Sequence, residues 1–249
     1  MTTIAAQVIL HPAATQSLKV LGTTLGRDKI YRAAQYFARF YAWFLVSKGY
    51  NIQAVRWNAL KSHLATGRKL MRIGKPLEHL QAALKAIHST TRFGEKVTTV
   101  LRQLCYAGYL GYDMAVWANS ARFVTLSKES SEKANRRSAR FWVWGIVFSI
   151  CHGLIKAGRL ANEAKELRSS SWGEKSTGSE AERAVRYAAV ENDRSSVRYQ
   201  FIIDLLDVWI PATNVGYVNL NDGVLGIFGL ITSLMALRSQ WAAVSKSKV

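Results

Sequence analysis

The sequence has few of the residues that build disulfide-bonded, loop-rich or disordered proteins. It contains two cysteines, three prolines and 16 acidic residues in 249 positions. The two cysteines share no CxxC spacing, which excludes a disulfide scaffold. The three prolines and 17 glycines leave few turns, which favours long helices over many short strands. Hydrophobic residues make up 49% and aromatic residues 11% of the chain, too much for intrinsic disorder.

Motifs for catalysis or metal binding are also missing. The sequence has no P-loop, GxGxxG or GxSxG, and none of its five histidines has HExxH spacing or a cysteine at ligand spacing. Asp204 and Asp207 share one helix face, but capping or pairing with Arg198 explains them better than acid–base chemistry. His152 lies in an apolar run, which favours a buried or interfacial histidine. We therefore expect neither an enzyme nor a bound metal or cofactor.

The charge is strongly basic and unevenly distributed. There are 34 Lys and Arg against 16 acids, a net charge of +18. Residues 1–77 hold twelve of the cations and one acid, Asp28. Such a surplus attracts either nucleic acid or an anionic membrane. No helix-turn-helix, zinc-finger or RNA-recognition signature is present, so we expect a membrane partner and no nucleic acid. The rival is a soluble helical nucleic-acid binder, which high-salt or carbonate washing would remove from membranes.

Turn signals and the absence of β-alternation predict an all-α fold. Asp28 and Asn51 are expected to cap helices, which end at Gly49 and Gly74, and residues 127–135 are expected to form a polar break. The expected helices cover residues 12–21, 28–46, 51–73, 77–88, 96–123, 136–167, 180–209 and 224–241.

The composition divides the chain into four regions in sequence order. A basic amphipathic region leads into apolar helices that include a candidate membrane span, and a Ser- and Gly-rich flexible linker precedes C-terminal helices with a second candidate span. These regions are 1–95, 96–168, 169–179 and 180–249, with the second span at 223–241. The fold class is therefore an all-α, membrane-associated protein.

Three apolar stretches approach the length of about 20 residues that a membrane-spanning helix needs. They are residues 104–121, which include Asp113, and the uncharged runs 141–155 and 223–237. Taken alone, each stretch equally fits the core helix of a soluble protein. The last one is followed by Arg238 and Trp241, a basic and aromatic flank typical of helix ends at lipid headgroups.

Glycines recur at every third position in the last apolar stretch, at Gly223, Gly226 and Gly229. On a helix this spacing produces a smooth stripe that permits close packing. In an ordinary soluble helix each glycine would cost about 1 kcal/mol relative to alanine. The stripe therefore predicts contact with lipid or with a closely packed helix.

Residues 56–75 form the most informative pattern, with six basic residues and no acid. On a helical wheel its apolar residues fall within an arc of roughly 80°, and most of its cations occupy the neighbouring arc. This pattern is typical of a helix lying in a membrane interface, although a surface helix on a protein core would also produce it. The expected membrane-inserting residues are Trp57, Leu60, Leu64, Leu70 and Met71. The expected lipid-phosphate contacts are Lys61, Arg68, Lys69, Arg72 and Lys75.

Several short motifs, in chain order, resemble the peroxin-eleven family of peroxisomal membrane-elongation proteins, and its fungal members most. The resemblance covers nearly the whole chain. The motifs are His11-Pro12, Gln16-Ser17-Leu18-Lys19, Thr23-Thr24-Leu25-Gly26-Arg27-Asp28-Lys29, Arg68-Lys69 with Arg72-Ile73-Gly74-Lys75-Pro76, Gly111-Tyr112-Asp113 with Trp117, and Asp204 with Asp207-Val208-Trp209-Ile210-Pro211.

The resemblance implies a protein of the peroxisomal membrane that elongates this membrane before fission. It implies that an amphipathic helix ahead of the Gly-Lys-Pro turn, here residues 56–74, inserts into one leaflet. Spans would match residues 97–117 and 223–241, with both termini in the cytosol. Asp113 would then lie near an interface or face protein. Self-association and partnership with a dynamin-related GTPase and its membrane adaptor are also expected.

A transport function is the alternative that the resemblance also permits. The chain would then form a pore for small metabolites, and solute flux through planar bilayers would distinguish it from a membrane wedge. The candidate pore-lining residues are Asp113, Asn119, Asn219 and Asn221.

Overall fold

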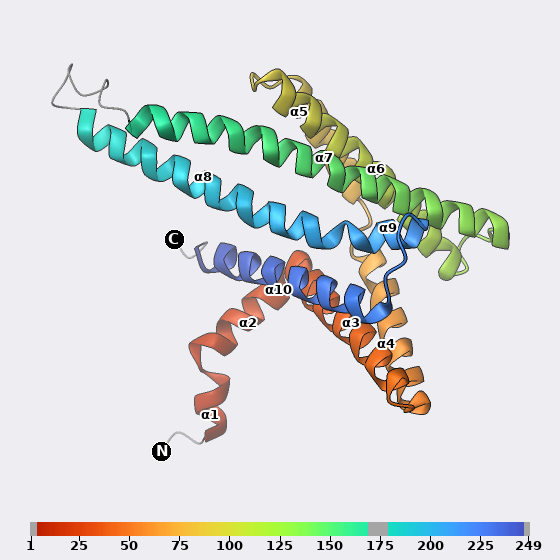
Figure 1. Ribbon diagram of the computed structural model, residues 1–249. Coiled ribbons are helices and arrows are strands. Elements are labelled where there is room, and N and C mark those ends of the chain that lie inside the picture. The colour runs from red at the N-terminus through yellow and green to blue at the C-terminus, as the bar shows by residue number, and fades with distance from the viewer. Residues whose placement is uncertain (1–3, 169–178, 247–249) are drawn as a thin grey trace. The chain divides into compact units, whose positions relative to one another are not determined.

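The structure, a computed structural model, describes residues 4–168 and 179–246, and most of these residues are helical (Figure 1). No strand occurs within these two ranges, which confirms the all-α prediction. The helices are α1 (Ile4–Ile9), α2 (Pro12–Gly22), α3 (Thr24–Ser47), α4 (Asn51–Leu70), α5 (Lys75–Ile87), α6 (Phe93–Ser120), α7 (Lys128–Arg168), α8 (Ser179–Asp207), α9 (Trp209–Val215) and α10 (Asp222–Lys246).

The chain folds into two compact units that combine segments distant in sequence. The first contains Met1–Ile73, Tyr112–Arg136 and Ala212–Val249, and the second contains Gly74–Gly111 and Arg137–Pro211. Helices α6 and α7 each contribute to both units. The expected linker lies outside the described residues, apart from its last residue, which begins α8.

The helix starts differ from the sequence prediction at the two expected caps. Thr23 caps α3, because its hydroxyl accepts a hydrogen bond from the Gly26 amide at 2.9 Å. Asp28 therefore lies inside the helix, and its prediction as a cap is wrong. Asn51 is also not a cap, since the cap position of α4 is Tyr50, which makes no side-chain capping bond.

The predicted glycine stop at Gly49 is confirmed, whereas α4 already ends at Leu70 and Gly74 is the cap position before α5. Gly49, with φ of 83°, follows α3, and Gly74, with φ of 87°, follows the turn after α4. Both lie in the left-handed region, which glycine enters without the steric penalty of a side chain. The first of these turns allows α3 and α4 to pack as a hairpin.

Helix α7 is longer than predicted. It begins at Lys128, so the expected polar break at residues 127–135 is wrong. Ser127 accounts for this start, because its hydroxyl accepts a hydrogen bond from the Ser130 amide at 3.2 Å and so caps the helix. The polar residues that looked like a break form the solvent-exposed first turns instead.

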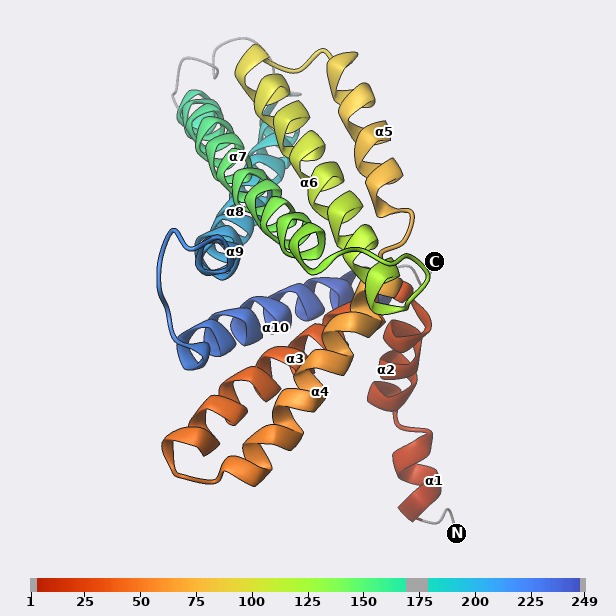
Figure 2. The ribbon, with the colours of Figure 1, turned by 90° about the vertical axis from the view of Figure 1, so that its right-hand side faces the viewer.

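In the first unit, α10 and α4 both pack against α3 (Figure 2). The predicted glycine stripe of α10 lies against aromatic residues of α3, and a Cβ on Gly226 would lie 2.6 Å from the Phe40 backbone nitrogen. Only glycine permits this approach, so the expected tight helix contact is confirmed. The aromatic residues that face the stripe are Tyr36, Phe40 and Trp43.

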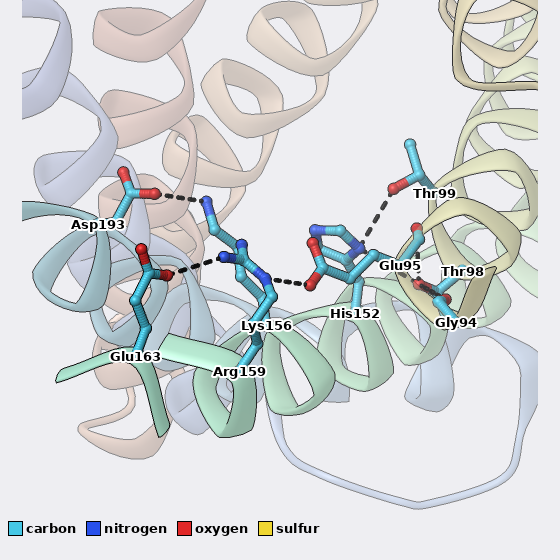
Figure 3. Close-up of polar contacts among 9 residues, drawn as sticks. All are labelled: Gly94, Glu95, Thr98, Thr99, His152, Lys156, Arg159, Glu163 and Asp193. Atoms are coloured by element: carbon cyan, nitrogen blue, oxygen red, sulfur yellow. Dashed lines mark hydrogen bonds and ion pairs between the residues drawn. The ribbon is translucent and has the colours of Figure 1, made fainter. Parts of the chain in front are cut away.

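The second unit combines a small apolar core with polar contacts between helices. Leu160, Ala164 and Leu167 of α7 pack with Val190 of α8 in the core. Figure 3 shows the polar contacts between α6, α7 and α8.

Arg159 of α7 donates to Glu95 of α6 at 2.6 Å, and Lys156 pairs with Asp193 of α8 at 3.3 Å (Figure 3). The His152 ring nitrogen lies 3.2 Å from the Thr99 hydroxyl. His152 is therefore a half-buried residue of a helix interface, as the sequence predicts.

Candidate membrane-binding surface

Among the described residues, two helices are long and apolar enough to cross a membrane. They are Lys128–Arg168 and Asp222–Ser245, which contain the predicted apolar stretches 141–155 and 223–237. Helix α6 is not one of them, although residues 97–117 were expected to span. Polar residues interrupt the apolar run of α6. Because charged side chains are costly inside a bilayer, these residues disfavour α6 as a membrane span. The first candidate span therefore moves from α6 to α7.

Asp113 of α6 faces protein, in agreement with the sequence prediction. It is 7% exposed. Its carboxylate lies 3.0 Å from Lys69 Nζ and 2.9 Å from Arg72 Nη2. This residue thereby joins α6 to the end of α4 within the first unit.

Two of the other candidate pore-lining residues have local structural roles. Asn119 Oδ1 accepts a hydrogen bond from the Leu126 amide at 2.8 Å, and Asn221 Oδ1 accepts one from the Val224 amide at 2.9 Å. The first closes the loop after α6 and the second caps α10. The pore therefore stays a prediction, and these two local contacts do not support it.

The predicted wedge on α4 is divided between a packed side and an outer side. Trp57 packs edge-on against Phe37 and Tyr41 of α3, with ring centroids 5.7 and 4.9 Å away. Leu64 and Met71 are half-buried. Leu60 and Leu70 are 42% and 52% exposed. The folded protein thus presents only the Leu60 and Leu70 part of the wedge to its surroundings.

Further apolar side chains extend this outer side. Ile52 and Val55 in the first turns of α4 are 75% and 68% exposed, and Ile73 in the turn after it is 46% exposed. None of the three was predicted, because Ile52 and Val55 precede the stretch 56–75 and Ile73 lies inside it but outside its apolar arc. Their signal was present, since apolar residues three positions apart continue the helical period in a stretch without acids.

The five cations predicted to bind lipid phosphate are all paired with carboxylates. Four lie on the side of α4, or of the turn after it, that faces the rest of the first unit, and Lys75 begins α5. The ion pairs are Lys61–Asp222 at 3.5 Å, Arg68–Asp28 at 2.9 Å, Lys69–Asp113 at 3.0 Å, Arg72–Asp113 at 2.9 Å and Lys75–Glu78 at 2.6 Å.

Arg68 and Asp28 form the most buried of these pairs, and their side chains are each 9% exposed. Arg68 Nη1 also donates to Gln35 Oε1 at 2.8 Å. Burial opposes ionisation of Asp28, but Arg68, Lys29 and Arg72 together outweigh it and hold the pKa of Asp28 below its ordinary value. Burial lowers the pKa of Arg68, although Asp28 acts in the opposite direction. Both groups are charged at neutral pH.

Asp222 connects three helices at the start of α10. Its Oδ1 accepts from Arg39 Nη2 of α3 at 2.7 Å, and its Oδ2 lies 3.5 Å from Lys61 Nζ of α4. One carboxylate therefore fixes α10 to α3 and also holds the middle of α4.

Asp204, the first residue of the acidic pair, is buried and hydrogen-bonded within the second unit. Asp204 accepts hydrogen bonds from Ser149 Oγ at 2.6 Å and Gln200 Nε2 at 2.9 Å. The expected partner, Arg198, pairs with Glu191 instead at 3.4 Å. No cluster of three His, Cys, Asp or Glu suited to a metal occurs in the described part of the chain.

The fold and this surface define a membrane-associated helical protein with a basic amphipathic helix. Residues 14–241 match the family described as Peroxisomal biogenesis factor 11 (PEX11). Because the match covers most of its length, the chain belongs to this family. No solved structure matches the chain significantly.

Its relatives include fungal and mammalian proteins of similar length. The chain is 27% identical to "Peroxisomal membrane protein PMP27" of Saccharomyces cerevisiae, over 95% of this chain and 98% of that protein. It is 28% identical to "Peroxisomal membrane protein PMP30A" of Candida boidinii, over 95% and 97%. It is 26% identical to "Peroxisomal membrane protein 11A" of Rattus norvegicus, over 88% and 93%.

These findings confirm the predicted family and place the chain in the peroxisomal membrane, with a role in peroxisome proliferation. The family and these relatives are named as membrane proteins or biogenesis factors and not as enzymes.

Proposed function

We propose that the chain elongates the peroxisomal membrane by inserting α4 into one leaflet, and so promotes peroxisome fission and proliferation. The observation that carries this proposal is the apolar outer side of α4. Leu60 and Leu70 are exposed there, within a stretch, residues 29–77, that contains ten Lys and Arg and no acid. Such a surface pairs apolar insertion with attraction to anionic lipid.

The physical effect follows from the asymmetry of insertion. Each leucine that moves from water into the acyl region contributes about 1.5–3 kcal/mol. Each Lys or Arg near an anionic leaflet adds about 1 kcal/mol. A helix inserted on one side expands that leaflet relative to the other, which favours curvature. Many copies side by side would draw the membrane into a tubule.

The proposal includes the arrangement around this helix. The apolar helices α7 and α10 anchor the chain, both termini face the cytosol, and copies of the chain associate in the membrane. The cytosolic side then offers the tubule to the fission machinery, a dynamin-related GTPase with its membrane adaptor. Protease protection of tagged termini and co-purification of differently tagged copies test these parts separately.

The central test is tubulation of vesicles by the full chain. The vesicles contain phosphatidylcholine with about one-third phosphatidylserine, and electron microscopy reports their shape. We expect tubules with the natural sequence and none with the double variant Leu60→Glu/Leu70→Glu. Both positions are exposed, so the helical circular dichroism of the variant should stay unchanged.

A matched control places the same charges on exposed apolar residues outside α4. Leu18 of α2 is 67% exposed and Val185 of α8 is 70% exposed. The variant Leu18→Glu/Val185→Glu should still form tubules. Tubulation by the α4 variant at the natural level would overturn the wedge assignment.

A further inference from the structure

Four cations of α4 and the turn after it are already paired with protein carboxylates in the folded chain, namely Lys61, Arg68, Lys69 and Arg72. Residues 29–77 contain no acid, so the carboxylates come from other parts of the chain. Asp28 precedes this stretch, Asp113 lies in α6 and Asp222 begins α10. Three separate elements of the first unit thus converge on one helix.

We propose that Asp28, Asp113 and Asp222 are the resident anions of a lipid-phosphate site on α4, and that phosphates of anionic lipid replace them when α4 inserts. The inference rests on the proposed function and gives it a control step. The carboxylates hold α4 against α3, α6 and α10 of the first unit until a sufficiently anionic surface competes for the same cations.

Lipid phosphate can replace carboxylate as the hydrogen-bond acceptor of these cations. Carboxylate and phosphate oxygens accept the same hydrogen bonds from guanidinium and ammonium groups. Arg68 donates through Nε to Asp28 at 2.9 Å, and Arg72 Nη2 lies 2.9 Å from Asp113. A lipid phosphate that takes the place of either carboxylate preserves the charge-assisted bonds of the arginine.

The geometry couples the exchange to insertion. Lys61 and Arg68 lie on the side of α4 that also carries Trp57, whose ring packs on α3. Trp57 and the half-buried Leu64 reach the acyl region only after that side of α4 separates from α3. Separation breaks the pairs with Asp28 and Asp222, so these carboxylates set how much anionic lipid is needed.

The experiment follows the packed side of α4 in the full chain. Leu64→Cys carries an environment-sensitive nitrobenzoxadiazole probe in a Cys105→Ser/Cys151→Ser background, and the chain is reconstituted into phosphatidylcholine vesicles with increasing phosphatidylserine. A blue-shifted emission that nitroxide-labelled lipid quenches reports insertion. The measured quantity is the phosphatidylserine fraction that gives half-maximal insertion.

The triple variant Asp28→Asn/Asp113→Asn/Asp222→Asn should lower this fraction about twofold or more, since the competing anions are gone. A charge-matched control removes acids that pair elsewhere, as Glu129→Gln/Glu163→Gln/Asp193→Asn. Their partners are Lys133, Arg159 and Lys156. The control should stay at the natural value, and an equal shift in both variants would overturn the proposal.

A second variant acts in the opposite direction and changes the fold very little. Gln35 accepts from Arg68 at 2.8 Å, so Gln35→Glu gives this arginine a second carboxylate of nearly the same shape. This variant should raise the phosphatidylserine fraction needed for insertion. A fraction that is unchanged or lower would overturn the proposal, even if the triple variant fails to fold.

Further outcomes separate the ideas. If the Leu64 probe of the natural chain never reaches the acyl region but the chain still forms tubules, only this inference is wrong, and if tubules are also absent, the proposed function fails with it. If the probe reaches the acyl region but Gln35→Glu and the triple variant leave the fraction unchanged, only the exchange is wrong. Inorganic phosphate with pure phosphatidylcholine vesicles should not shift the emission, and a shift there would assign the site to soluble phosphate instead of lipid.

Discussion

Helix α3 packs against α10 and against α4 through different kinds of contact. Against α10 it offers aromatic rings to a stripe of glycines, at a distance where no side chain fits. Against α4 it supplies Asp28 for a buried ion pair with Arg68, and rings that pack on Trp57. The contact with α10 depends mainly on shape, with the Arg39–Asp222 ion pair at its end, and the contact with α4 combines ring packing with a buried ion pair.

The two kinds of contact respond differently to a membrane. Close packing of backbone against rings has no partner in lipid that could replace it. Ion pairs do have such partners, because lipid phosphates bind the same cations. Under the exchange proposed above, α10 would keep its position on α3 and α4 would change its position at an anionic membrane.

The largest loss of thermal stability should come from placing a side chain in the close contact between α10 and α3. Gly226→Leu places a side chain where the Cβ alone would meet the Phe40 backbone at 2.6 Å. Overpacking costs up to about 3 kcal/mol when side chains can yield, and here the obstacle is backbone. We expect the thermal midpoint in detergent micelles, followed by circular dichroism, to fall by roughly 10 °C.

Gly67→Leu on α4 is the matched control, because nothing lies within 4 Å of a Cβ at that position. It should leave the midpoint unchanged or raise it slightly, since leucine favours helix over glycine. Equal losses in both variants would show that helix propensity, and not the contact with α3, causes the effect.

A slightly smaller loss should follow from removing the buried cation. Arg68→Met keeps the volume but leaves Asp28 without its closest partner, which costs about 3 kcal/mol for a buried pair. Lys29, 3.6 Å from Asp28, remains and limits the loss. The exposed Arg56 on the same helix supplies the control Arg56→Met, whose thermal midpoint should match the natural chain.

The smallest effect should appear as a dependence on pH. The folded state lowers the pKa of Asp28 below its ordinary 3.8. The stability from this group is complete above that ordinary pKa, which Asp28 has in the unfolded chain, and it is lost as pH falls through the lower folded value. The thermal midpoint of the natural chain should exceed that of Asp28→Asn most at neutral pH. A difference that grows in acid would contradict this sign.

The helical fold and the glycine stripe were predictable because they depend on local period and spacing, and the family was predicted from the resemblance of short motifs in chain order. Gly226 is identifiable as a packing residue from its neighbours at three-residue intervals. Helix starts were less accurate, since Thr23 and Asp28 are both good capping residues and only the backbone decides between them.

The candidate site was harder to predict for a physical reason. A helical wheel shows which residues share a side of α4, but not which side meets protein. Lys69 and Arg72 reach a carboxylate in α6, and Lys61 reaches one in α10. These partners are brought near only by tertiary folding, so the amphipathic pattern alone placed all of the cations at lipid.

The three carboxylates would not lose the same share of their ion-pair partners if α4 separated from the rest of the first unit. Asp222 retains Arg39, and Asp28 retains Lys29. Asp113 is different, because Lys69 and Arg72 both leave with α4 and its turn, and its side chain is only 10% exposed. An uncompensated charge in such surroundings raises the free energy of the open form. This one residue would act as a restoring force, so that membrane bending is reversible when the anionic surface is withdrawn.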